Sequence, residues 1–186
     1  GELHYLYSQR VNLGVVRSEE NALWSFAPHD LSVIGLLLGE RPRSVVCRGA
    51  CYLQQGIEDV VFLNLHYPSG VMAQIQLSWL DPHKLRRMTV VGSRKMAVFD
   101  DGHPTDKIVI YDKGVSSRGA KQFNSYGEYL SIRDGDTVIP RLELGEPLGL
   151  EARHFIDRVL DRGIPASSAQ QGLEVVQILE AAQQSM

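Results

Sequence analysis

The sequence has few cysteines, no long apolar run and no excess of positive charge. Among its 186 residues are two cysteines, and 19 Lys and Arg stand against 22 Asp and Glu, for a formal net charge of −3. This balance argues against a nucleic-acid-binding domain, because such domains are usually strongly basic. The apolar runs, such as residues 36–38, are far shorter than the roughly 20 residues of a membrane-spanning helix. We therefore expect a cytoplasmic protein that binds neither nucleic acid nor membranes.

The chain also lacks a Gly-x-Gly-x-x-Gly motif, the usual signature of a dinucleotide-binding turn. Its length and its 44% hydrophobic residues suit a single domain over residues 1–186. Because Gly1 is not an initiator methionine and a strand pattern starts almost at once, we expect a piece of a longer chain. Cys47 and Cys51 are expected on one strand, both buried and reduced, and no metal site is predicted.

Alternating apolar and polar residues predict a largely antiparallel sheet. Strands are expected over residues 3–11, 44–54, 59–67, 71–79, 87–91, 95–99 and 107–111. The pattern weakens over 113–142, which indicates loops and one short strand. Two amphipathic helices are predicted to follow, one from Pro147 to Gly163 and one capped by Ser167 or Ser168. The expected fold class is α+β, with helices packed on one face of the sheet.

A further helix is expected between the first two strands. Proline is favoured at the first helical position and glycine just past the end, so Pro28 and Gly39 predict its limits. His29 and Asp30 would then lie in the first turn. There the helix dipole stabilises a carboxylate and keeps an imidazole neutral. We interpret His29 as a candidate proton-transfer residue; the alternative is a histidine that only helps to begin the helix. Asp30 either interacts favourably with the helix dipole or orients His29 or a substrate hydroxyl.

Other candidate substrate-binding residues lie near this helix. Arg10 and Asn12 end the first strand, where their partner is either a polar substrate or solvent. Trp24 precedes the predicted helix start and suits either stacking on a sugar or packing in the core. Lys84 opens a cationic cluster with two arginines over residues 84–87, which either holds phosphates or forms a solvated surface.

Several stretches together resemble the C-terminal domain of the Gfo/Idh/MocA family, the glucose–fructose oxidoreductase and inositol dehydrogenase group. They are Arg10–Gly14, Pro28–Leu31, Leu37–Val45, Val90–Met96 with Asp100 and Asp101, Glu146–Leu148 and Gly172–Ala182. The resemblance implies a two-domain dehydrogenase in which an upstream domain, absent here, binds NAD or NADP. That domain also supplies a catalytic lysine from a Glu-Lys-Pro motif.

The family commonly shows Asp-x-x-x-His leading into the helix, and the histidine serves in acid–base work on the sugar. His29 matches the histidine, whereas Ser25 stands at the aspartate position. Serine supplies no negative charge, which leaves hydrogen bonding to substrate as its expected role. The resemblance also implies a homodimer or homotetramer through the open face of the sheet, with which the polar row Gln74, Gln76 and Ser78 is compatible.

We therefore expect the substrate-binding half of an NAD(P)-dependent oxidoreductase that acts on a CH–OH group of a sugar, polyol or nucleotide sugar. Alone, this half is expected to be inactive. Two alternatives stay open. One is a non-catalytic binding or dimerisation module of the same fold, which the departure at Ser25 favours. The other is a cofactor-free hydrolase or isomerase that uses His29 and Asp30.

Overall fold

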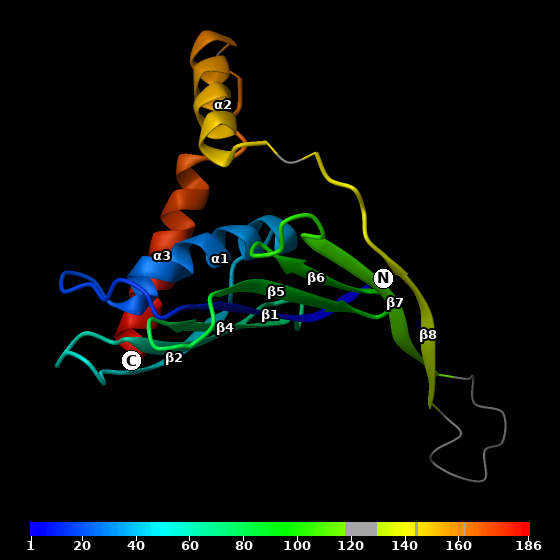
Figure 1. Cartoon of the computed structure of the whole chain (residues 1–186), viewed down its shortest axis with the longest axis horizontal. Helices are drawn as coiled ribbons and strands as arrows, with labels where there is room; N and C mark the ends of the chain where they lie inside the picture. Colours follow the sequence, from blue (N-terminus) through cyan, green and yellow to red (C-terminus); the bar gives the residue numbers. More distant parts are fainter. Residues whose placement is uncertain (118–129, 144, 162) are drawn as a thin grey trace.

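A single eight-stranded sheet forms the centre of the molecule, in the strand order β2-β3-β4-β1-β5-β6-β7-β8 (Figure 1). The computed structural model describes residues 1–117, 130–143, 145–161 and 163–186. The strands are β1 (Leu3–Val11), β2 (Ser44–Ala50), β3 (Val60–His66), β4 (Met72–Ser78), β5 (Leu85–Gly92), β6 (Met96–Asp100), β7 (Ile108–Ser117) and β8 (Leu130–Val138). Neighbouring strands run antiparallel, except that β1 and β4 run parallel. The predicted α+β fold class is confirmed.

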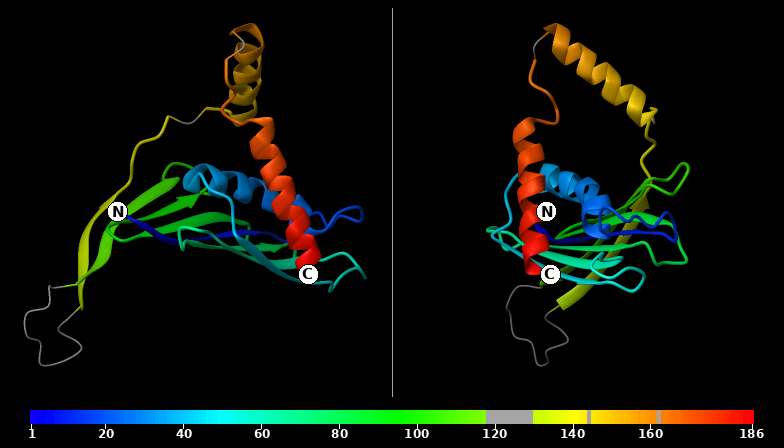
Figure 2. Two further views of the ribbon diagram at one scale, coloured as in Figure 1. Left: turned by 180° about the vertical axis from the view of Figure 1, so that it is seen from behind. Right: turned by 90° about the vertical axis from the view of Figure 1, so that its left-hand side faces the viewer.

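Two helices cover one face of this sheet. They are α1 (Ala22–Leu38) and α3 (Ala169–Ser185), which cross the same side of the sheet in Figure 2. Their buried side chains meet the alternate residues of the central strands that point to the same side. Core residues that are at most 2% exposed include Leu6, Ile34, Leu63, Ile75 and Leu179. In the described part of the chain, no helix is long and apolar enough to cross a membrane.

The third helix, α2 (Pro147–Asp161), begins at the predicted proline but does not pack on the sheet. It projects beyond α3, away from the strands (Figures 1 and 2). None of its residues is buried, and Phe155, Ile156, Val159 and Leu160 are each more than half exposed. The expectation of helices on one face therefore holds for α1 and α3, and α2 keeps an uncovered apolar stripe.

The strand β2 ends at Ala50, earlier than the predicted strand. The chain turns here because the backbone amides of residues 52–53 donate to Asp59 Oδ2 at 2.8 and 2.7 Å. Cys51 consequently lies outside the strand and is exposed, while Cys47 is buried. The expectation that both thiols share a buried strand face is wrong. Burial raises the pKa of Cys47 to about 11.

The last two strands are longer than the weak pattern over 113–142 predicts. β7 continues to Ser117, and β8 pairs with it from Leu130 to Val138. Residues 132–139 are exposed, so no apolar alternation is needed for this pairing and the sequence carries little signal of it. The part of the predicted loops that falls on 118–129 lies outside the described residues.

Candidate functional site

The helix that carries His29 begins earlier than predicted. Asn21 is its N-cap: the backbone there is extended, and the Asn21 side chain accepts a hydrogen bond from the Trp24 amide at 3.2 Å. Pro28 lies inside the helix. His29 and Asp30 are therefore not in the first turn, and the prediction that the helix dipole acts on them is wrong. Only the end of the helix is as predicted, at Gly39 with a φ of 65°.

The interior position brings Ser25 and His29 together on one side of α1. They are four residues apart, which is one helical turn, so their side chains are neighbours on the helix surface. Ser25 is half-buried and His29 is exposed. The sequence motif thus becomes a spatial pair, in which a hydroxyl stands one turn before an imidazole.

A buried ion pair lies next to His29. Arg10, near the end of β1, donates from Nε to Asp30 Oδ2 at 2.7 Å, and the two side chains are 19% and 6% exposed. Asp30 thus holds an arginine from the sheet. The pair fixes the end of β1 beneath the middle of α1.

The surroundings of His29 favour its neutral form. The pKa of His29 is lowered first by burial of part of the ring, then by the cation of Arg10, and to a smaller extent by Arg86. The carboxylate of Asp30 acts in the opposite direction. A neutral imidazole at neutral pH can accept a proton from a bound hydroxyl, and its protonated form can return it.

The register of the sheet brings Arg86, one of the two arginines in the predicted cationic cluster, next to Arg10. Arg86 of β5 lies directly opposite Arg10 of β1, on the side of the sheet that α1 covers. Its Nη1 lies 3.4 Å from Asp101 Oδ2, and Lys107 Nζ lies 3.1 Å from Asp101 Oδ1. The lysine hydrogen bond is the main reason that the pKa of Asp101 is lowered. Arg87, the next residue, faces the opposite side of the sheet.

The remaining predicted residues differ in their placement. Asn12 follows β1, and its backbone amide donates to Ser78 O at 3.1 Å. The buried side-chain Oδ1 of Asn12 has no hydrogen-bond partner among the described residues. Lys84 is exposed immediately before β5. Trp24 turns toward α3, where its Nε1 donates to Gln183 Oε1 at 3.2 Å. That contact supports the packing role for Trp24 rather than stacking on a sugar.

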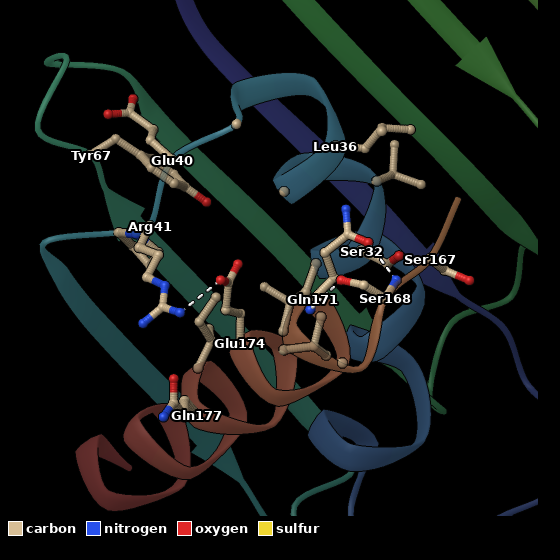
Figure 3. A pocket seen from close by; sticks show the side chains of 18 of the residues that line it. Ser32, Leu36, Glu40, Arg41, Tyr67, Ser167, Ser168, Gln171, Glu174 and Gln177 are labelled. Carbon is tan, nitrogen blue, oxygen red and sulfur yellow. Dashed lines mark hydrogen bonds and ion pairs between the residues drawn. The ribbon is translucent and has the colours of Figure 1, made fainter. Parts of the chain in front are cut away.

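A separate groove of about 1210 Å³ lies on another side of α1. It runs between α1, α3 and the start of β2, and Figure 3 shows the Arg41–Glu174 ion pair (2.7 Å) and the Tyr67 ring lining it. His29 and Arg10 do not line this groove. It is therefore distinct from the cluster around His29.

Comparison with known proteins confirms the predicted resemblance. Residues 15–98 match the family model of the GFO/IDH/MocA C-terminal domain. This segment includes α1 with Ser25, His29 and Asp30, as well as β2 to β5. No curated protein sequence gives a significant match.

Solved structures show the same fold over the whole chain. UDP-N-acetylglucosamine 3-dehydrogenase GnnA from Acidithiobacillus ferrooxidans has a TM-score of 0.77 at 18% identity, covering 100% of this chain and 54% of its own. An aldose-aldose oxidoreductase from Caulobacter crescentus has a TM-score of 0.72 at 15% identity, and the match covers 100% of this chain and 53% of that protein. An NAD-binding protein from Listeria innocua has a TM-score of 0.71 at 16% identity, and the match covers 100% of this chain and 57% of that protein. The chain thus spans about half the length of these proteins.

Proposed function

We propose that this chain, whose residues 15–98 match the family model of the GFO/IDH/MocA C-terminal domain, is the substrate-binding half of an NAD(P)-dependent dehydrogenase. The proposed substrate is a CH–OH group of a sugar, polyol or nucleotide sugar. Two proteins that share the fold support this choice: the dehydrogenase from Acidithiobacillus ferrooxidans is named for a nucleotide sugar, and the oxidoreductase from Caulobacter crescentus is named for aldoses.

The observation that carries the proposal is the environment of His29. An exposed imidazole whose pKa is lowered, one turn from the Ser25 hydroxyl, suits proton exchange with a substrate hydroxyl. In this proposal His29 takes the hydroxyl proton during oxidation and returns it during reduction. Ser25 donates or accepts a hydrogen bond to the same substrate, and the Arg10–Asp30 pair keeps the strand end and the helix in place.

The connection that leads into α1 lacks the signature of a dinucleotide-binding turn. The connection from β1 to α1, residues 12–21, has Gly14 as its only glycine, whereas dinucleotide-binding turns carry several at the strand–helix junction. We therefore propose that a separate domain of the complete protein binds NAD or NADP. The bound nicotinamide would supply hydride chemistry, and this half alone would show no turnover.

The apolar stripe of α2 supports the presence of a further domain. A helix that exposes Phe155, Val159 and Leu160 to solvent is unusual in a complete folded protein, because burial of such side chains stabilises a fold by about 1.5–3 kcal/mol each. The proteins of the same fold are about twice as long as this chain. We therefore propose that the dinucleotide-binding domain of the complete protein covers this stripe.

We also propose that copies associate through the face of the sheet that α1 and α3 leave open. Tyr5 and Tyr7 stack there with ring centroids 6.4 Å apart, and Phe62 is 43% exposed on the same face. The expected polar row contributes only in part, because Ser78 is 3% exposed and its hydroxyl accepts from the Leu80 amide at 2.8 Å. The measurement is the mass in solution, with Tyr7→Glu expected to give monomers.

The proposed function is tested by the coding sequence upstream of Gly1. A βαβ unit with a glycine-rich turn, followed by Glu-Lys-Pro, supports the dehydrogenase. An initiator codon directly before Gly1 contradicts it. That result would favour the second candidate, a non-catalytic binding or dimerisation module, for which Ser25 in place of the family aspartate is the specific observation.

A further inference from the structure

We propose that Arg10 and Arg86 together hold an oxyanion of the substrate, a carboxylate or a phosphate, beside His29. This inference rests on the proposed function and narrows its substrate class from sugars in general to acidic ones. The starting point is the sheet register, which places the two guanidinium groups on directly opposed residues of neighbouring strands. Residues in that relation have their Cβ atoms about 4.5–5.5 Å apart.

Two like charges in this arrangement call for negative partners. Two carboxylates are near: Asp30 accepts from Arg10 Nε at 2.7 Å, and Asp101 lies 3.4 Å from Arg86 Nη1. Asp101 is shared, because Lys107 Nζ lies 3.1 Å from its other oxygen. The cluster thus holds three basic side chains and two carboxylates, and a third anion would balance it.

The donors needed to hold such an anion are present. The hydrogen bond of Arg10 uses Nε, and within the described residues neither of its Nη groups has a hydrogen-bond partner. The contact of Arg86 with Asp101 is long, and the side chain is 46% exposed, so a ligand can reach it. Guanidinium groups offer planar pairs of N–H donors that match the two oxygens of a carboxylate or a phosphate.

The location relative to His29 gives this anion a role in specificity. Arg10 is bound to Asp30, the residue that follows His29 in α1, and Arg86 lies directly opposite Arg10 on the neighbouring strand. A sugar acid or sugar phosphate anchored by the arginines would therefore present its hydroxyl groups near the imidazole. A neutral sugar would lack this anchor.

The test uses the 186-residue chain and three probes: glucuronate, glucose 6-phosphate and glucose. Binding is followed by NMR through the ring signal of His29, at about 0.15 M salt, where charges separated by more than roughly 8 Å are largely screened. We expect at least one acidic probe to shift this signal saturably and to bind at least tenfold more tightly than glucose. The acidic probe that binds more tightly distinguishes a carboxylate from a phosphate site.

Arg86→Gln is expected to weaken the binding of the acidic probe about tenfold or more and to leave the binding of glucose unchanged. Arg87→Gln is the matched control, because it removes the same charge from the opposite face of the same strand. A thermal melt of each variant checks that it is folded. Equal weakening by both substitutions, equal binding of glucose and the acidic probes, or no binding of either acid would overturn the proposal.

These outcomes are separate from those of the proposed function, because binding is measured without a nicotinamide. Acid binding that depends on Arg86, in a protein that shows no hydride transfer when complete, would retain the oxyanion site and reject the dehydrogenase. Hydride transfer from neutral sugars that Arg86→Gln does not affect would retain the dehydrogenase and reject the oxyanion site.

Discussion

Arg10 and Asp30 form an ion pair of 2.7 Å that joins the end of the first strand to the middle of the first helix. The pair positions His29, since it fixes the part of α1 where this residue lies above the sheet. Its carboxylate is 6% exposed, so the loss of the arginine leaves a buried negative charge without its main partner.

Arg10→Gln is therefore expected to lower the free energy of unfolding by about 2–4 kcal/mol. The double variant Arg10→Gln/Asp30→Asn removes both charges and is expected to recover part of this loss. Urea unfolding of the single and double variants measures the difference. A single variant as stable as the parent chain would show that the ion pair contributes nothing to stability.

The second prediction concerns the pH dependence of His29. Its ring signal is expected to titrate below the ordinary histidine value of about 6.5, since partial burial and Arg10 disfavour the charged form. The unfolded chain binds the proton more readily, so this residue's contribution to stability is complete above the ordinary value and is lost as the pH falls through the lower folded value. Arg86→Gln should raise the pKa and Arg87→Gln should not. Titration at or above the ordinary value contradicts this account.

The third prediction concerns the start of α1. The Asn21 side chain accepts a hydrogen bond from the Trp24 amide and donates to Glu58 Oε2 at 2.6 Å and to Gln183 Oε1 at 2.9 Å. It therefore joins the start of α1 to α3 and to the segment that precedes β3. Asn21→Ala is expected to cost about 1–3 kcal/mol of unfolding free energy. Ser168→Ala is the control, because among the described residues the Ser168 hydroxyl has a hydrogen bond only with the Gln171 amide, and it should cost about 1 kcal/mol or less. Equal costs would show that the contacts beyond the cap contribute nothing.

The fourth prediction separates α2 from the core. In this chain Phe155→Ala should change the unfolding free energy by less than about 0.5 kcal/mol, because the side chain is 68% exposed. Ile34→Ala removes a fully buried side chain of α1 and should cost about 2–5 kcal/mol. In the complete protein, where we propose that a further domain covers α2, Phe155→Ala should cost more than in this chain. Costs that are the same in both would contradict the proposed cover.

The strands could be predicted from the sequence, whereas the start of α1 could not. Alternation of apolar and polar residues, as from Val71 to Trp79, directly indicates a strand with one face buried and the other exposed. At α1 the proline signal is misleading, because Pro28 lies inside the helix and the cap is Asn21, which precedes an apolar segment. The candidate His29 was found despite this error, because the family motif does not depend on where the helix begins.

The surroundings of His29 were only partly predictable. The sequence points to Arg10 and Asp30 as separate candidates, but their ion pair depends on how α1 crosses the sheet. Arg86 was grouped with Arg87 as one cationic cluster, whereas strand alternation places them on opposite faces. The pairing of β1 with β5 joins residues that are far apart in the sequence, such as Arg10 and Arg86, and local sequence patterns carry no information on such long-range partners.

The central claim is that His29 exchanges a proton with the substrate of a nicotinamide-dependent dehydrogenase. The most direct test is hydride transfer by the complete gene product, followed by nicotinamide absorbance, for the parent, His29→Ala and the exposed control His83→Ala. We predict that His29→Ala lowers kcat by about 10²–10⁴-fold while cofactor binding and the control stay unchanged. A rate within a few-fold of the parent for His29→Ala would contradict the account.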